Sequence, residues 1–252
     1  MSGHSKWHTI RRKKAVTDAR RGKAFTQIIK EITIAAKIGG GDPGGNPRLR
    51  LAIDKAKASN MPSDNIKRAV MKGTGELPGM SYEDVTYEAY GPGGAALIIE
   101  CVTDNKVRTI SDIRHILDRN HGKLASSGAV AFQFHRKGLI SVPKNVIGED
   151  DIMTVILDAG ADDLATEDET YTVTCAPESF ESVKKALEAK GIKIDHAELH
   201  LVTENTVKVE GKDAENLLKL VEALEEHDDV QHVFSNFDID DKVIASLAAA
   251  GA

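Results

Sequence analysis

Apolar residues recur at helical spacing in the first third of the chain and predict three helices there. Between residues 17 and 38, five apolar side chains fall three or four positions apart, on one side of a helix: Phe25, Ile28, Ile29, Ile32 and Ala36. Asn46 followed by Pro47 is typical of a helix start, and this second helix is expected to run to about residue 58. A third, short helix is expected from about residue 60 to Gly73. Three short amphipathic helices predict a small bundle.

Beyond residue 81 the pattern changes to short strands that alternate with helices. Six elements between residues 138 and 202 follow the order βαββαβ, which is that of a ferredoxin-like domain. They are expected at 138–142 (strand), 149–159 (helix), 162–166 and 170–175 (strands), 177–190 (helix) and 193–202 (strand).

The residues on either side of that block show the same order a second time. Strand 95–103, helix 107–120, strands 129–134 and 206–209, helix 213–227 and strand 230–238 form the second set, with 85–90 as an additional strand. The predicted fold class is α+β, with a helical bundle followed by two ferredoxin-like domains, one inserted in the other. We expect a basic helical domain at 1–78, a split α/β domain at 79–135 plus 205–243, and the inserted domain at 136–204. An insertion at a hairpin tip leaves the host core intact.

Charge divides the chain more sharply than its net charge of −6 indicates. Residues 1–75 hold 17 Lys and Arg against 5 Asp and Glu, a net charge of +12. The other residues hold 16 basic and 34 acidic side chains, a net charge of −18. A basic end of this kind favours a polyanion such as nucleic acid. The same charges are also consistent with docking of the basic part on the acidic part.

The basic end provides the candidate nucleic-acid-binding residues. The first sixteen residues have almost no apolar stripe, and we expect an arm that orders on phosphate. In helix 17–38 the side opposite the apolar stripe is almost entirely basic. The candidates are His4, Lys6, Trp7, Arg11, Arg12, Lys13, Lys14, Arg20, Arg21, Lys23, Lys30, Arg48 and Arg50. Two interpretations of Trp7 stay open, namely stacking on an exposed base and packing against the bundle.

Composition argues against several classes of protein. Cys101 and Cys175 are the only cysteines, and they lie far apart, which argues against a disulfide framework and for a reducing compartment. No apolar run is long enough to cross a membrane, and residues 1–7 lack the apolar stretch of a secretory signal. We therefore expect a cytoplasmic protein without a membrane partner.

No motif predicts an enzyme, a metal site or a cofactor. The GPGG segment at 91–94 lacks the pattern of a phosphate-binding loop and is expected to be a turn. The acidic clusters at 149–151, 167–169 and 225–229 are expected to be solvated rather than metal-binding. His115 is expected to have a capping or core role rather than a catalytic one.

The segment 128–134 has a faint similarity to the aromatic strand of an RNA-recognition sheet. It lacks the basic residue that such a strand carries at its start. Phe132 and Phe134 are therefore expected to lie in the core.

Several segments resemble the YebC/PmpR family. They are GHSKW at 3–7, DARRGK at 18–23, NPRLRLAI at 46–53, NMP at 60–62 with DNI at 64–66, YEAYGPGG at 87–94 and TDN at 103–105. The resemblance continues through Arg108-Thr109 and Arg114-His115 and covers essentially the whole chain. Residues 8–14 read HTIRRKK where many members are closer to ANIKHRK, so the charge is kept while individual basic positions differ.

The resemblance implies a non-enzymatic regulator of gene expression. The family is described as bacterial DNA-binding transcriptional regulators, and it includes mitochondrial translational activators of cytochrome oxidase. It is also described as ribosome-associated factors that help translation through stretches such as consecutive prolines. We expect a DNA-binding transcriptional regulator, with a ribosomal-RNA-associated translation factor as the first alternative. A protein-interaction scaffold that uses the acidic domains is the second.

Overall fold

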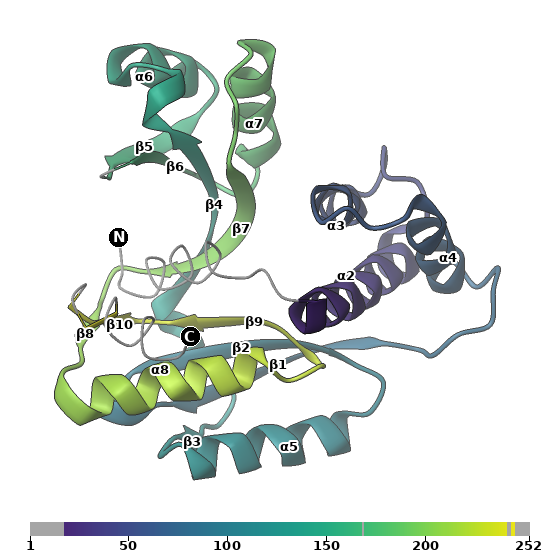
Figure 1. The fold of residues 1–252 in the computed structure, drawn as a ribbon, viewed down its shortest axis with the longest axis vertical. Coiled ribbons are helices and arrows are strands. Elements are labelled where there is room, and N and C mark those ends of the chain that lie inside the picture. Colours follow the sequence, from purple (N-terminus) through teal and green to yellow (C-terminus); the bar gives the residue numbers. More distant parts are fainter. Residues whose placement is uncertain (1–17, 168, 241–242, 245–252) are drawn as a thin grey trace. The chain divides into compact units, whose positions relative to one another are not determined.

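The structure is a computed structural model that describes residues 18–167, 169–240, 243 and 244 (Figure 1). The chain divides into two compact units. One is formed by residues up to 132 together with those from 205 onward, and the other by residues 133–204. The predicted α+β class is confirmed, with helices first and antiparallel sheets after them. In the described part, no helix combines the length and apolar character needed to cross a membrane.

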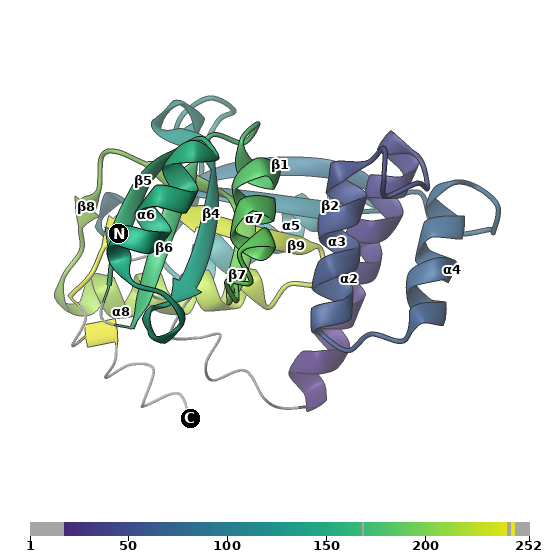
Figure 2. The same ribbon diagram turned by 90° about the horizontal axis from the view of Figure 1, so that it is seen from above.

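Three helices open the larger unit, as the sequence predicts. They are α2 (Asp18–Gly39), α3 (Pro47–Ala58) and α4 (Ser63–Gly73). Helices α3 and α4 both pack on α2 and have little contact with each other (Figure 2). Ile32, Leu49 and Ala69 are among the buried residues at this junction, which is the apolar stripe expected from the spacing.

Asn46 joins the end of α2 to the start of α3. Its side-chain oxygen accepts a hydrogen bond from the backbone N–H of Leu49 at 3.1 Å. Its amide nitrogen donates to the carbonyl oxygens of Ala35, at 2.8 Å, and Gly40, at 2.9 Å. One buried side chain therefore caps both helices.

We expect Asn46→Ala to lower the free energy of unfolding by about 2 kcal/mol, because the substitution removes a helix cap and two hydrogen bonds to backbone carbonyls. Urea denaturation followed by circular dichroism measures the change. Asn65→Ala is the matched control, since the Asn65 side chain forms no hydrogen bond within the described part of the chain. Equal stability of the two variants would contradict the double-cap role.

A four-stranded sheet completes the larger unit, in the order β3-β1-β2-β9. Its strands are β1 (Glu83–Tyr90), β2 (Ala96–Thr103), β3 (Lys123–Leu124) and β9 (Val230–Ser235). Helices α5 (Lys106–Arg119) and α8 (Gly211–Glu225) lie on the same side of this sheet (Figure 1). Ile99, Ile113 and Leu217 belong to the core between them.

The strand order corrects the expected second ferredoxin-like domain. Strand β1 was expected to be additional, but it lies between β3 and β2, in the position that the third strand of a ferredoxin-like sheet takes. The turn η1 (Pro92–Gly94) joins β1 to β2, and all eight residues of β1 pair with β2. The two-residue strand β8 (Val207–Lys208) pairs instead with β10 (Phe237–Asp238), in parallel. A long local hairpin thus takes the position that a short, distant strand was expected to fill.

The expected strand at 129–134 does not form. That segment contains a loop and the 3₁₀ turn η2 (Ala131–Gln133), and β4 begins only at Phe134. The carboxylate of Glu88 accepts hydrogen bonds from the backbone N–H groups of Gly128, Val130 and Ala131, at 2.5, 2.7 and 2.9 Å. Because a side chain occupies these donors, they are not available to a neighbouring strand.

The smaller unit has the ferredoxin-like topology that the sequence predicts. Its elements are β4 (Phe134–Pro143), η3 (Lys144–Val146), α6 (Glu149–Asp158), β5 (Ala161–Thr166), β6 (Thr170–Cys175), α7 (Phe180–Ala189) and β7 (His196–Thr203). The strands lie in the order β5-β6-β4-β7, and every neighbouring pair is antiparallel. Buried residues include Ile140 of β4, Ile156 of α6 and Phe180 of α7.

Candidate nucleic-acid interface

The structure describes only some of the candidate residues. Seven lie outside the described residues: His4, Lys6, Trp7, Arg11, Arg12, Lys13 and Lys14. Arg20 and Arg21 belong to the first turn of α2, and their side chains lie outside the described part of the structure. Lys23 is half-buried on the same helix. Side-chain contacts are therefore described in detail for the other three candidates, Lys30, Arg48 and Arg50.

Lys30 points into the protein rather than to solvent. Its amino group lies 2.6 Å from the Asp229 carboxylate and donates to the Asp228 carbonyl oxygen at 2.9 Å. The side chains of Lys30 and Asp229 are both buried. A cation held in this way is already neutralised, so we remove Lys30 from the proposed interface.

Asp229 collects further donors from helix α5 and from the end of β2. Arg108 contacts its other oxygen at 2.8 Å, and the hydroxyl groups of Thr109 and Thr103 donate to that oxygen at 2.7 and 3.3 Å. Burial by itself raises the pKa of Asp229, but the hydrogen bonds from Lys30, Arg108 and Thr109 outweigh it and hold that pKa well below its usual range. Asp229 therefore stays ionised and ties α2 to the sheet.

Arg48 is also neutralised within the chain. Its guanidinium group contacts both oxygens of Glu31, at 2.7 and 3.0 Å, and both oxygens of Asp84, at 2.6 and 2.8 Å. The Asp84 hydrogen bonds are the largest cause of a raised Arg48 pKa; burial opposes them, and Glu31 adds to them. Arg48 links α3 to α2 and β1, so we exclude it from the proposed interface as well.

Arg50 contacts the loop before its own helix. One of its terminal nitrogens donates to the Pro43 carbonyl oxygen at 3.0 Å. The side chain is half-buried. Its geometry favours a role in holding the glycine-rich loop between α2 and α3.

Helices α3 and α4 carry exposed basic side chains. Five basic side chains there are exposed and form no ion pair within the described part of the chain: Lys55, Lys57, Lys67, Arg68 and Lys72. None of these five is among the candidates expected from the sequence. The signal was present, because the inward positions of α4, Ile66 and Ala69, leave Lys67, Arg68 and Lys72 on the outer side of that helix.

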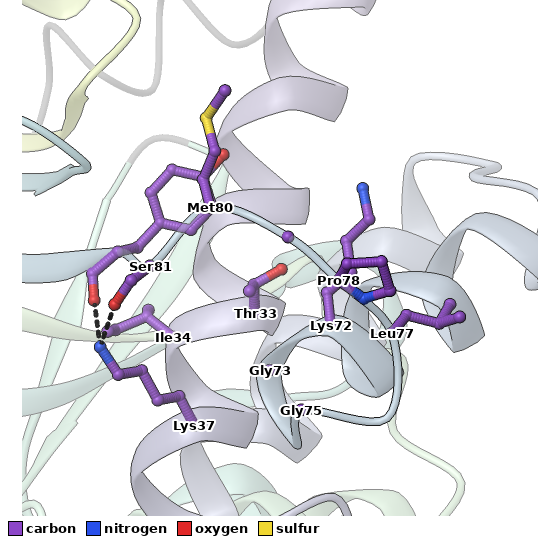
Figure 3. A pocket seen from close by; sticks show the side chains of 12 residues that line it. Thr33, Ile34, Lys37, Lys72, Gly73, Gly75, Leu77, Pro78, Met80 and Ser81 are labelled. Atoms are coloured by element: carbon purple, nitrogen blue, oxygen red, sulfur yellow. Dashed lines mark hydrogen bonds between the residues drawn. The ribbon is translucent and has the colours of Figure 1, made fainter.

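An open pocket of about 330 Å³ adjoins this surface. It lies between α2, the end of α4 and residues 75–82 (Figure 3). Lys72 lines one side. On the other, the Lys37 amino group donates to the Ser81 hydroxyl at 2.8 Å and the Tyr82 carbonyl oxygen at 2.9 Å. Neither contact neutralises Lys37, so the pocket adds positive charge beside α4.

The structure also describes the GPGG segment and His115. The GPGG segment forms a turn, in which the Gly91 N–H donates to the Ala95 carbonyl oxygen at 2.8 Å. Among the described residues, no group of three His, Cys, Asp or Glu is placed to hold a metal ion. His115 is exposed on α5, which corrects the expectation of a capping or core role.

Comparisons with known proteins agree with one another. The family model described as TACO1/YebC protein N-terminal domain matches residues 5–76, and the model described as TACO1/YebC second and third domain matches residues 82–237. A "Probable transcriptional regulatory protein" of Chlorobaculum parvum is 56% identical over 98% of this chain and 99% of the relative. A relative of the same description from Chlorobaculum tepidum is 55% identical with the same coverage.

A solved structure supports the same relationship. The crystal structure of a conserved hypothetical protein from Aquifex aeolicus matches with a TM-score of 0.82 and 42% sequence identity, covering 90% of this chain and 94% of that one. The two family models together span most of the chain, and the identities extend over nearly its whole length. The chain belongs to the TACO1/YebC family.

Proposed function

We propose that this protein is a nucleic-acid-binding regulator of gene expression. The observation that carries the proposal is the set of five exposed, unpaired cations on α3 and α4, in a segment whose net charge is strongly positive. Lys and Arg side chains of this kind contact phosphate oxygens. The basic residues at positions 6–14 add to the same charge.

The names of the relatives favour transcription as the process. Two relatives more than 50% identical to this chain are called probable transcriptional regulatory proteins, which supports a role in transcription. A regulator of that kind would act on DNA in the cytoplasm. Phosphate contacts position a protein on nucleic acid without reading its sequence, and they suit a structured RNA surface equally. A translation factor bound to ribosomal RNA is therefore the second candidate.

Replacement of the five cations by Gln tests the interface. With Lys55, Lys57, Lys67, Arg68 and Lys72 changed together, affinity for a 20-base-pair DNA duplex at 100 mM salt should fall about 10- to 100-fold. The log–log salt slope should become shallower by up to about 4, because fewer counterions are released. Fluorescence anisotropy titrations at several salt concentrations give both values.

A matched control separates a local surface from net charge alone. Five exposed lysines of the acidic part can be changed to Gln with the same change in net charge: Lys185, Lys190, Lys193, Lys212 and Lys219. This variant should bind within about twofold of the original protein. Equal losses in both variants would show that long-range charge, and not α3 and α4, determines binding.

Crosslinking in cells, followed by sequencing of bound DNA and bound RNA, distinguishes the two candidates. Enrichment of promoter DNA supports transcriptional regulation, and enrichment of ribosomal RNA supports the translation factor.

A further inference from the structure

Phe132 is an exception among the phenylalanines of this protein. The chain has six phenylalanines, and five of them are buried or half-buried. Phe132 is 72% exposed, which corrects the expectation that it lies in the core. Phe134, two residues further on, is buried as expected. A single exposed apolar side chain carries no argument by itself, so the residues around the ring decide what it can bind.

The side chain of Glu88 holds the loop that carries Phe132. This carboxylate is only 7% exposed, and it accepts the three backbone hydrogen bonds from Gly128, Val130 and Ala131. Val130 itself is fully buried. The backbone is therefore fixed up to the residue before Phe132, so little conformational entropy is lost when the ring meets a partner.

Tyr90 and Lys123 stand beside the same loop. They are directly paired across β1 and β3, so their side chains are neighbours on one side of the sheet. Tyr90 is 40% exposed, and its hydroxyl donates to the Ala129 carbonyl oxygen at 3.3 Å. Lys123 is exposed and forms no ion pair with any described residue. Two aromatic rings and a free cation thus border one short loop.

The surrounding sequence is free of negative charge. No Asp or Glu occurs between Asp118 and Glu149, although this stretch belongs to the part of the chain whose net charge is −18. Arg119 and Lys123 are the basic residues of this stretch in the larger unit. A stretch of sequence that lacks Asp and Glu and carries Arg119 and Lys123 suits a polyanion better than the rest of the acidic part does.

We propose that Phe132, Tyr90 and Lys123 form a contact site for an unpaired nucleotide of single-stranded nucleic acid. Phe132 stacks on the base, Lys123 meets the adjacent phosphate, and Tyr90 positions the loop and offers part of its ring. Every base has a face that stacks on an aromatic ring, so the site tolerates different sequences. The inference deepens the proposed function, since it adds a single-stranded element to the target.

Binding of single-stranded and double-stranded RNA tests this site in the full chain. Phe132→Ala should weaken binding of a fluorescein-labelled U12 oligonucleotide about tenfold, because one base–aromatic stack is lost. Affinity for a 12-base-pair RNA duplex should change less than twofold, and Phe132→Tyr should bind both as the original protein does. Val107→Ala is the control, since Val107 is another exposed apolar residue of the same unit.

The outcomes separate this site from the helical interface. A selective loss for U12 in Phe132→Ala supports the inference even if the five-cation variant binds normally. An unchanged U12 affinity, or equal losses for U12 and duplex, overturns it. Normal nucleic-acid binding by Phe132→Ala together with loss of a co-purifying protein would assign the ring to a protein partner and also overturns it. Circular dichroism confirms that each variant is folded.

Discussion

Asp229→Ala is expected to lower the free energy of unfolding of the larger unit by about 3–5 kcal/mol. The substitution leaves Lys30 buried without its counterion, and an unpaired buried charge is among the costliest defects that one replacement creates. It also frees the hydroxyl groups of Thr103 and Thr109 from their acceptor. Urea denaturation followed by circular dichroism measures the loss.

Arg108→Ala is the control for this prediction. Arg108 contacts the same carboxylate, but its side chain is half exposed, so its removal should cost no more than about 1 kcal/mol. The double variant Lys30→Met, Asp229→Asn should recover part of the loss, because it removes both buried charges together. If Asp229→Ala lowered the free energy of unfolding by less than about 1 kcal/mol, the Lys30 amino group would be readily hydrated in the variant. The ion pair between Lys30 and Asp229 would then contribute little to stability.

The same interaction predicts a dependence on pH. The pKa of Asp229 is lower in the folded protein than its ordinary value of 3.8. Its contribution to stability is therefore complete above that ordinary value and is lost as the pH falls towards the folded pKa. The difference in stability between the original protein and Asp229→Ala should consequently shrink below about pH 4.

Glu88→Ala is the second substitution with a large expected effect, a loss of about 3 kcal/mol. It removes three hydrogen bonds to a charged acceptor, each of which contributes on the order of 1 kcal/mol or more, and it leaves the buried N–H group of Val130 without an acceptor, whereas Gly128 and Ala131 are exposed to water. Burial raises the pKa of Glu88, yet these three hydrogen bonds outweigh it and lower the pKa overall. The ionised side chain of Glu88 is therefore the form that accepts the three hydrogen bonds of the loop.

Hydrogen exchange distinguishes loss of the loop from general destabilisation. In Glu88→Ala the amides of residues 128, 130 and 131 should lose protection before those of β2. Glu83→Ala removes a carboxylate from the same strand, where Glu83 forms only an exposed ion pair with Lys106, and it should change stability by less than 1 kcal/mol. Full protection of the loop amides in Glu88→Ala would show that other contacts hold the loop.

Asp229 and Asp84 explain how the basic helical segment is attached to an acidic remainder. The hypothesis that the basic part simply docks on the acidic part is correct for two side chains. Lys30 pairs with Asp229, and Arg48 pairs with Glu31 and Asp84. It does not account for the five cations of α3 and α4, which form no ion pair among the described residues. Attachment and binding thus use different basic residues of the same segment.

Local signals in the sequence were sufficient for the helices and for one whole domain. The cap at Asn46, the apolar spacing of α2 and the βαββαβ order of residues 133–204 all depend on neighbours within one or two elements. Hydrophobic periodicity and capping act over a few residues, so they can be read before the fold is known. The charge division and the family resemblance likewise belong to the sequence alone.

Tertiary structure decided where the charged groups and the marginal strands lie. Lys30 and Asp229 are 199 positions apart, and no local pattern indicates that they meet. Residues 129–134 have the composition of a strand, but the carboxylate of Glu88 accepts hydrogen bonds from the backbone N–H groups of Val130 and Ala131, 42 and 43 positions away. The same loop brings Phe132 into solvent. Side-chain partners of this kind are selected by the packed fold, because the cost of burying a charge or an N–H group depends on what surrounds it.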